Sequence, residues 1–425
     1  MLTLQQIRND KEKVIKGLKK RNLSDVAEAI DEIIQTDDQR KVTQTKLDQL
    51  LSEQNQYSKQ IGQYFQQGKA DEANSLKSKV AELKEISQTL ELDQREIHSK
   101  LDGLLLSIGN VPHESVPSGN SEDDNEIIKE NKTATPDLGD KPLPHWELAK
   151  KYNLIDFELG TKITGSGFPL YRGKGAKLQR ALINFFLDEA QEAGYEEIIP
   201  PHLVNEDSAR STGQLPDKEG QMYHMPLDNL YLIPTAEVPV TNIYRDVILK
   251  EGDFPIKLTG YTPCFRREAG SYGSDVKGLN RVHQFDKVEI IQVAHPKKSY
   301  TVLDEMVLHV ENLLNKLNLP YRILRLCGGD LGFTSALTFD FEVFSAAQKK
   351  WLEVSSVSNF ETYQSNRLKL RFKDEKGKKH LAHTLNGSAL ALARIVAALL
   401  ENNQTKDGIK IPEVLRPYTR FDVIK

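Results

Sequence analysis

The sequence predicts an α+β protein in which an N-terminal antiparallel two-helix coiled-coil arm precedes a domain built on a mostly antiparallel sheet flanked by helices. The arm is predicted by residues 26–107, which contain no proline and keep a heptad pattern. The sheet is predicted by short β-rich runs after residue 145 that do not alternate regularly with helices. The sequence contains neither GxxxxGK[ST] nor GxGxxG, so a parallel-sheet nucleotide fold has no support.

The heptad seam of the arm falls into two halves, separated by QQGKADE with Gly68 as the break. Steps of three and four residues connect Leu47, Leu50, Gln54, Tyr57, Ile61 and Tyr64, and then Leu76, Val80, Leu83, Ser87, Leu90, Gln94, Ile97, Leu101 and Leu104. Folding the halves back pairs positions whose numbers add up to 140 or 141, which places Gln54 opposite Ser87. The alternative is a coiled coil between two chains, which the short break and the matched polar layer disfavour. Toward the base the register degrades, since Arg40 would fall opposite Leu101.

The outer faces of the arm carry lysines mixed with acidic residues. These lysines are Lys46, Lys59, Lys69, Lys77, Lys79 and Lys84. A mixed charge run usually only keeps a helix face hydrated, and contact with an RNA backbone is the functional alternative. Helices of about 40 residues, each rising about 1.5 Å, predict an arm of about 60 Å.

Length and composition limit the class of protein. The 425 residues exceed one ordinary core, so two domains are expected. With 57 basic and 61 acidic residues the formal net charge is −4, so any nucleic-acid contact must come from local basic patches. Cys264 and Cys327 lie far apart without CxxC spacing, which predicts no zinc site, no disulfide framework and a reducing cytoplasm. No apolar run reaches about 18 residues, so we expect an intracellular protein without a membrane span.

The chain is predicted to divide into an N-terminal domain over 1–108, with the arm over about 26–107, a linker over 109–144, and a mixed α/β domain over 145–425. The linker is predicted by its proline, glycine and acidic residues. Within the last domain, amphipathic periodicity predicts helices over 175–193, 300–317 and 390–401. Short β-rich runs predict strands over 196–199, 231–234, 287–293 and 321–326.

One stretch of this domain, residues 262–289, combines cations, carboxylates, an aromatic ring and glycines. Arg266 and Glu268 are two apart, so on a strand both side chains point to one face. Such a set suits a nucleotide bound beside a small zwitterion, and a solvated hairpin is the alternative. Glu289 lies in the apolar run VEIIQV and is the hardest to assign to a purely structural role, because an unpaired buried carboxylate is costly.

Several segments together resemble the seryl-tRNA synthetases of the bacterial type, in the class II aminoacyl-tRNA synthetase superfamily, over essentially the whole chain. GYEEIIPP, which ends at Pro201, is similar to the dimer-forming motif 1. PCFRREAG…HQFDKVE is similar to motif 2 and NGSALALAR to motif 3. IPTAE and EVSSVSN are similar to the serine- and ATP-site segments of the family. The family commonly has Gly at the position of Ala389, and Gly or Pro at that of Ala393.

The resemblance implies roles for individual residues. It makes Arg266 and Arg394 the catalytic cations, because guanidinium groups suit phosphate oxygens. Its serine-binding positions are Thr235, Ala236, Glu237, Arg266, Glu289, Asn386 and Ser388. Its ATP-binding positions are Arg266, Arg267, Glu268, Val282, Phe285, Glu353, Val354, Ser355, Ser356 and Arg394. Glu353 and Ser356 match its Mg²⁺ pair, since Mg²⁺ prefers oxygen ligands. The structural alternatives are surface arginines, a core Phe285 and a paired buried Glu353.

The resemblance also implies an activity and partners. The activity is ATP-dependent conversion of L-serine to seryl-adenylate, followed by transfer of the seryl group to tRNA(Ser), and to tRNA(Sec) where present. ATP is then a substrate, Mg²⁺ the metal, and zinc is not needed. The arm would grip tRNA(Ser), motif 1 with Pro201 would form a homodimer, and the location would be cytoplasmic.

Two other functions are compatible with parts of the sequence. A paralogue that activates an amino acid and loads a carrier protein would, by resemblance, lack the long arm and use cysteine-ligated zinc. A non-catalytic RNA-binding or scaffold protein should have lost at least one charge among Arg266, Glu268, Glu353 and Arg394. The sequence keeps the arm and all four charges, so both alternatives are disfavoured.

Overall fold

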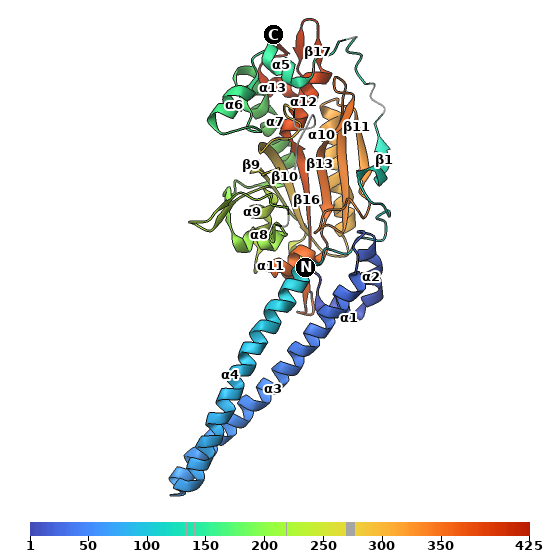
Figure 1. Ribbon diagram of the computed structural model, residues 1–425. Helices are drawn as coiled ribbons and strands as arrows, with labels where there is room; N and C mark the ends of the chain where they lie inside the picture. The colour runs from blue at the N-terminus through green and yellow to red at the C-terminus, as the bar shows by residue number, and fades with distance from the viewer. Residues whose placement is uncertain (132–134, 140, 218, 269–276) are drawn as a thin grey trace. The chain divides into compact units, whose positions relative to one another are not determined.

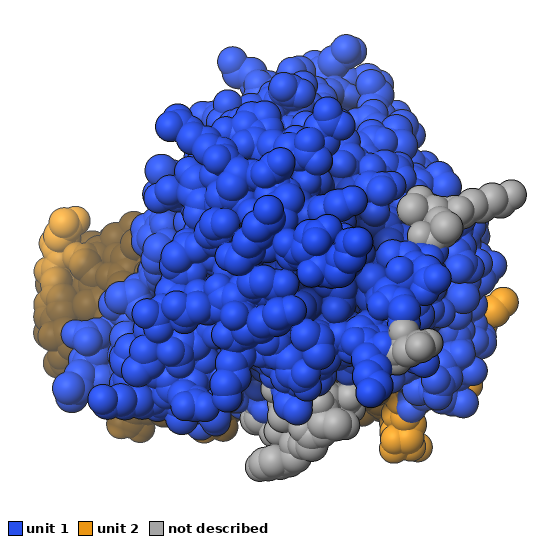
Figure 2. All heavy atoms as spheres, turned by 90° about the horizontal axis from the view of Figure 1, so that it is seen from above, with its two compact units in different colours: residues 1, 20–22, 110–425 blue, residues 2–19, 23–109 orange. Residues whose placement is uncertain are grey.

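The computed structural model describes residues 1–131, 135–139, 141–217, 219–268 and 277–425. These residues form two compact units, which Figure 2 distinguishes by colour. One unit comprises residues 2–19 and 23–109, and the other comprises residues 1, 20–22 and 110–425. Positions 269–276, with two glycines of the predicted motif 2 loop, and positions 132–134 and 140 of the predicted linker lie outside the described residues.

The larger unit is organised around an eight-stranded sheet of order β1-β11-β12-β13-β16-β10-β9-β4 in the described part of the chain. Its neighbouring strands are antiparallel except for β4 and β9. The strands are β1 (Glu126–Glu130), β4 (Glu196–Glu197), β9 (Ile256–Phe265), β10 (Gln284–Ala294), β11 (Tyr321–Arg325), β12 (Leu337–Ser345), β13 (Lys350–Asn359) and β16 (His383–Ala391). The predicted antiparallel α+β body is confirmed (Figure 1).

Three long helices pack against this sheet: α7 (Gly173–Glu192), α10 (Ser299–Lys316) and α12 (Leu392–Asn402). In α7 the buried residues Leu178, Leu182, Phe185 and Phe186 recur at helical spacing and form one apolar stripe. Strand β10 is buried from Lys287 to Ala294, as expected for a central strand covered on both faces. One large apolar core therefore joins the helices to the sheet.

Shorter elements surround this core. The helices are α5 (His145–Lys151), α6 (Phe157–Ile163), α8 (Glu206–Thr212), α9 (Glu237–Thr241), α11 (Thr362–Leu368) and α13 (Arg416–Thr419). The strands of four small sheets are β2 (Ile155–Asp156) and β3 (Leu170–Tyr171); β5 (Leu203–Asn205), β6 (His224–Met225) and β7 (Leu230–Leu232); β8 (Ile248–Lys250), β14 (Arg371–Lys373) and β15 (Lys379–Leu381); and β17 (Gln404–Thr405), β18 (Gly408–Lys410) and β19 (Val423–Ile424). Strand β1, which pairs with β11, was not predicted from the sequence.

The smaller unit consists of α1 (Leu4–Asn9), α2 (Lys11–Lys19) and the two long helices α3 (Val26–Gln66) and α4 (Ala70–Ser107). Figure 1 shows α3 and α4 running side by side in opposite directions, so the predicted antiparallel hairpin is confirmed. Every predicted seam residue is buried or half-buried. All six lysines predicted to project outward are exposed.

The helix register changes along the arm. In the predicted register Gln94 would face residues 46 and 47, but its Nε2 donates to Gln44 Oε1 over 3.0 Å. Closer to the base, Lys100 Nζ lies 2.8 Å from Glu32 Oε1. Compared with the predicted register, each α4 residue named here contacts a residue earlier in α3, and the difference is larger closer to the base. The register therefore departs from the prediction where the seam was expected to degrade.

A buried carboxylate anchors the base of the arm. The side chain of Asp37 on α3 is 1% exposed and forms ion pairs with Arg8, Arg40 and Lys41 at 2.6, 2.8 and 2.9 Å. Burial alone would raise the pKa of Asp37, but hydrogen bonds from Lys41, Arg40 and Arg8 outweigh it and lower the pKa to about 2. The ionised form thus connects α1 to α3.

We predict that Asp37→Asn destabilises the smaller unit by about 2 kcal/mol at neutral pH, because three cations lose their shared partner. A lowered folded-state pKa stabilises the fold above the ordinary value of 3.8, and this contribution disappears as the pH falls toward 2. Thermal unfolding of both proteins between pH 2 and 7 should therefore converge at the acidic end. Asp93→Asn, at an exposed position on α4, is the matched control. Equal stability of wild type and Asp37→Asn at pH 7 would contradict the prediction.

Candidate active site

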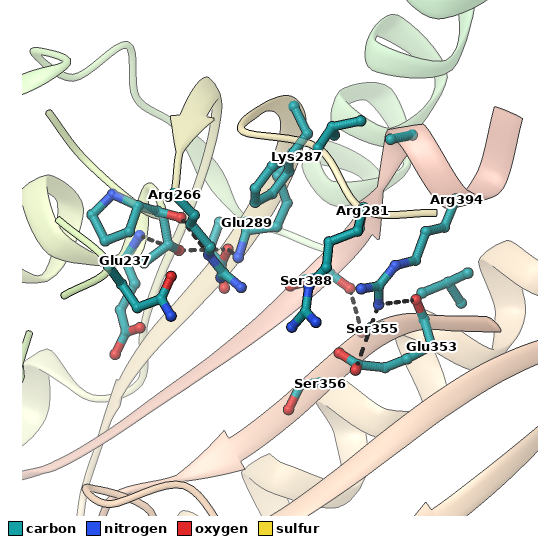
Figure 3. Close-up of a pocket in the computed structure, with 18 of the residues that line it drawn as sticks. Glu237, Arg266, Arg281, Lys287, Glu289, Glu353, Ser355, Ser356, Ser388 and Arg394 are labelled. Atoms are coloured by element: carbon teal, nitrogen blue, oxygen red, sulfur yellow. Dashed lines mark hydrogen bonds and ion pairs between the residues drawn. The ribbon is translucent and has the colours of Figure 1, made fainter. Parts of the chain in front are cut away.

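The larger unit encloses a cavity of about 500 Å³ on the sheet, lined by polar side chains from strands that are distant in the sequence. Most predicted site residues line it: Thr235, Glu237, Arg266, Glu268, Val282, Phe285, Glu289, Glu353, Val354, Ser355, Ser356, Asn386, Ser388 and Arg394. Figure 3 shows Glu237, Arg266 and Glu289 together at one end, and Arg281, Glu353 and Arg394 toward the other. The structure thus brings the separate sequence segments into one site.

Three predicted residues lie elsewhere. Ala236 is fully buried in an apolar cluster with Val240 and Leu258 and does not line the cavity. Arg267 is exposed, and its guanidinium lies 5.7 Å from the ring centroid of Tyr223. Pro201 is exposed beyond the end of β4.

Strand geometry explains which side chains face the cavity. On β10, Phe285, Lys287 and Glu289 alternate with residues that point to the other face. On β13 the pairing with β12 shifts, because Glu353 pairs with Glu342 while Ser355 pairs with Phe341. This β-bulge interrupts the alternation, and it allows the consecutive residues from Glu353 to Ser356 to line the cavity.

Glu289 is the most thoroughly bonded carboxylate of the site. Thr235 Oγ1 donates to its Oε2 over 3.0 Å, and Asn386 Nδ2 donates to its Oε1 over 3.1 Å. Lys287 Nζ lies 2.6 Å from Oε2, and the two side chains are only 7% and 1% exposed. The buried charge is therefore paired and hydrogen-bonded, as a low-dielectric position requires.

A second carboxylate, Glu237, begins helix α9 close by. Gln364 Nε2 donates to Glu237 Oε1 over 2.6 Å, and Thr384 in turn donates to Gln364 over 2.8 Å. Burial, and then the charge of Glu289, raise the pKa of Glu237 to about 7. A cation entering this end of the cavity would favour the ionised form of Glu237.

The opposite end of the cavity is organised by arginines. Arg394 Nη1 donates to the carbonyl oxygen of Glu353 over 2.7 Å, and its Nε donates to that of Asn280 over 3.1 Å. Arg281 pairs with Glu268 at 2.5 Å. At the end with Glu237 and Glu289, the Arg266 guanidinium lies 5.3 Å from the ring centroid of Phe285. Both ends therefore present guanidinium groups to an anion.

The oxygen atoms at this end suit a divalent cation. The Glu353 side chain is 51% exposed, and Ser356 lies beside it on the cavity wall. Behind them Asp340 accepts a hydrogen bond from Ser356, while its buried Oδ1 has no partner in the described structure. Burial, and then the charge of Glu353, raise the pKa of Asp340 well above its ordinary value. Among the described residues no cluster of three or more His, Cys, Asp or Glu could hold a metal, so a cation here would need further oxygen ligands from substrate or water.

Several residues of the site were not predicted to bind substrate. Lys287 and Arg281 line the cavity within the stretch that was singled out. The spacing of Lys287, two residues from both Phe285 and Glu289, was a usable signal. Gln364 and Asn280 carried no such signal, because their roles depend on contacts between distant segments.

Two family models and several known proteins match this chain. Residues 1–112 match the family model of the seryl-tRNA synthetase N-terminal domain, and residues 223–403 match the tRNA synthetase class II core domain (G, H, P, S and T). A serine–tRNA ligase of Salinibacter ruber is 50% identical over 423 residues, which cover 99% of this chain and 98% of that protein. This chain belongs to the seryl-tRNA synthetase family. It is therefore an enzyme of the aminoacyl-tRNA synthetase class, and the carrier-protein alternative is not favoured.

Other relatives agree with this placement. A serine–tRNA ligase of Chlorobaculum parvum is 46% identical over 428 residues, which cover all of both chains. The crystal structure of seryl-tRNA synthetase from Pyrococcus horikoshii complexed with ATP is 34% identical, covers 100% of this chain and 99% of its own, and superposes with a TM-score of 0.91. Among the described residues, no helix is long and apolar enough to span a membrane.

We predict that Glu237→Gln becomes more stable relative to wild type as the pH rises. A raised folded-state pKa means that the ligand-free fold retains a proton that the unfolded chain has lost, so wild type loses stability between pH 4.5 and 7. The change in relative unfolding free energy should be about 3 kcal/mol, measured by urea unfolding between pH 4 and 8. Glu305→Gln, at an exposed position, should show no such trend. A pH-independent difference for Glu237→Gln would refute a protonated Glu237.

Proposed function

We propose that the cavity activates L-serine with ATP and that the seryl group then passes to a tRNA. The observation that carries the proposal is Glu289, a buried carboxylate that accepts from Thr235 and Asn386 and pairs with Lys287 at one end of a cavity whose other end carries arginines. A small zwitterion with a hydroxyl group and a polyphosphate together match this distribution of charge. The family relationship and the ATP complex of the Pyrococcus horikoshii relative support the same substrates.

The serine half lies between Glu237 and Glu289. Glu289 offers only acceptor atoms, and beside the bonds from Thr235, Asn386 and Lys287 it can accept a further one from the serine hydroxyl, which alanine lacks. Glu237 would bind the ammonium group, whose charge favours the ionised carboxylate. Arg266 would bind the serine carboxylate and the α-phosphate, because it lines the cavity beside Glu237 and Glu289. Ser388, paired across the strands with Glu289, completes this half.

The nucleotide half lies between Phe285 and Arg394. Phe285 would stack on the adenine, with Glu268 and Val282 beside it, and Arg394 would neutralise the γ-phosphate. Glu353 and Ser356 would hold Mg²⁺, which supplies charge neutralisation of the phosphates when bound. Val354 and Ser355 contribute the strand wall, where Ser355 Oγ donates to the Ser388 carbonyl over 2.6 Å. Arg267, exposed beside Tyr223, would need to turn inward to contact ATP.

The reaction that this arrangement favours is in-line attack of the serine carboxylate on the α-phosphorus of ATP. A new O–P bond joins the carboxylate oxygen to the α-phosphorus and gives seryl-adenylate, while the bond from the α-phosphorus to the bridging oxygen breaks and releases pyrophosphate. A tRNA hydroxyl then attacks the acyl carbon and releases AMP. Positioning and charge neutralisation by Arg266 and Arg394 supply the acceleration, so no protein nucleophile is needed.

Two further parts of the proposal concern partners. The exposed lysines of the arm would contact the phosphate backbone of tRNA(Ser), which positions the RNA without reading its bases. The exposed surface around Pro201, with Ile199 at 86% exposed and Leu203 at 40%, would be covered by a second copy of the chain. A cytoplasmic location is consistent with two free cysteines.

The direct test is serine-dependent exchange of labelled pyrophosphate into ATP. Folded protein should catalyse this exchange with serine and not with alanine or glycine. Absence of exchange with serine would reject the proposed activity.

We predict that Glu289→Gln lowers the preference for serine over alanine in pyrophosphate exchange by at least about 100-fold, since the substitution replaces one of the two acceptor oxygens with an NH₂ donor. The ATP KM should change far less, because Glu289 lies in the serine half. Glu305→Gln removes an exposed carboxylate and should leave both values unchanged. An unchanged serine preference in Glu289→Gln would show that another group recognises the hydroxyl.

We predict that replacing the six outward arm lysines with alanine abolishes most tRNA charging and leaves pyrophosphate exchange intact. Lost phosphate contacts should also weaken the salt dependence of tRNA binding. Replacing the same lysines with arginine retains the charges and should preserve charging. If the alanine variant charges tRNA as wild type does, the arm lysines do not hold the RNA.

A further inference from the structure

The described cavity wall includes a segment without helix or strand, residues 278–282, that contains Arg281 and contacts Arg394. The carbonyl oxygen of Asn280 accepts a hydrogen bond from Arg394 Nε, and Arg281 forms an ion pair with Glu268. Leu279 through Val282 all line the cavity. The position of this segment therefore sets the position of the guanidinium groups that face the cavity.

Beneath this segment lies a buried histidine that the proposed reaction does not use. His145 begins helix α5 and is 0% exposed. The backbone N–H of Leu279 donates to His145 Nε2 over 2.8 Å. Gly278 fits against the same ring, since it has a φ of +68° and a Cβ there would fall 2.2 Å from Nε2. The imidazole thus fixes the start of the segment in two ways: Nε2 accepts the hydrogen bond from Leu279, and the ring packs closely against Gly278.

Glu401 on α12 determines which ring nitrogen accepts. His145 Nδ1 lies 2.7 Å from Glu401 Oε1, and the backbone N–H of His145 donates to the same oxygen over 2.9 Å. Because Nε2 accepts a hydrogen bond from Leu279, the proton of the neutral ring is on Nδ1, and this N–H donates a hydrogen bond to the carboxylate. Ser345 donates to the other carboxylate oxygen. The carboxylate therefore holds the ring in one tautomer and one orientation.

A second branch reaches the segment from the same carboxylate. Gln348 Nε2 donates to Glu401 Oε1 over 2.8 Å. Asn280 Nδ2 then donates to Gln348 Oε1 over 2.8 Å. Two consecutive residues of the cavity wall, Leu279 and Asn280, are thus tied to one buried carboxylate by separate routes.

We propose that His145, oriented by Glu401, is a positioning residue that places segment 278–282 for nucleotide binding. The proposal rests on the proposed function for the identity of the nucleotide half. Without the acceptor at Nε2, the buried N–H of Leu279 has no partner, and the segment moves to find one. The serine half would be spared, because Glu289 and Glu237 are held by Thr235, Asn386 and Gln364.

The test compares His145→Phe, which keeps a ring without an acceptor, with His145→Gln, whose Oε1 can accept from Leu279. In pyrophosphate exchange His145→Phe should raise the ATP KM about 10- to 100-fold and change the serine KM less than about twofold. His145→Gln should recover most of this loss. Hydrogen–deuterium exchange at Leu279 should accelerate in His145→Phe and not in His145→Gln. His309→Phe, at a half-buried histidine on α10 that does not line the cavity, should leave both KM values unchanged.

The outcomes separate the two proposals. If wild type shows no serine-dependent exchange, the proposed function fails, whereas the exchange rate of the Leu279 amide still reports on His145. If wild type is active and His145→Phe keeps the ATP KM, or raises both KM values equally, the positioning role is rejected. If His145→Phe does not fold, Glu401→Gln should show the same selective rise in the ATP KM, and equal rises in both KM values would again reject the role.

Discussion

The site depends on the ion pair between Lys287 and Glu289 in the middle of β10. Two opposite charges, both almost fully buried, can occupy a central strand only when they neutralise each other and their remaining atoms find partners. Thr235 comes from the segment before α9, and Asn386 comes from the neighbouring strand β16. Satisfying one carboxylate therefore brings together three segments that are far apart in the sequence.

The two ends of the cavity are stabilised by different means. At the serine end, bonds converge on carboxylates from strands and short helices that the apolar core already holds in place. At the nucleotide end, Arg394 donates to two backbone carbonyl oxygens of the cavity wall, so its position relies on the wall itself being fixed. This difference explains why a buried network beneath segment 278–282 accompanies one end of the cavity and not the other.

Much of this arrangement could be predicted from the sequence, because it rests on local patterns. The heptad seam defined both arm helices, and the even spacing of Phe285 with Glu289 marked a strand with a polar face. The prediction that Arg266 and Glu268 share a strand face was wrong, because β9 ends at Phe265 and both residues lie beyond it. Strand β1 was missed, since it is a short exposed edge strand inside a segment of linker-like composition. Gln364, His145 and Glu401 were missed because side-chain partners across tens or hundreds of residues leave no periodic trace. The family resemblance identified the site residues themselves, whereas the residues that hold them in place could be identified only from the structure.

The bulge in β13 constrains the length of the chain more than the identity of its residues. Glu353 to Ser356 line the cavity together only because one extra residue interrupts the pairing with β12. Removing a single residue there would restore regular alternation and turn every second side chain of this run toward the opposite face. Homologues should therefore tolerate apolar substitutions of similar volume at the buried Val354 more readily than insertions or deletions beside it. In this part of the protein, evolution by gain or loss of residues is restricted even where the side chain itself makes no chemical contribution.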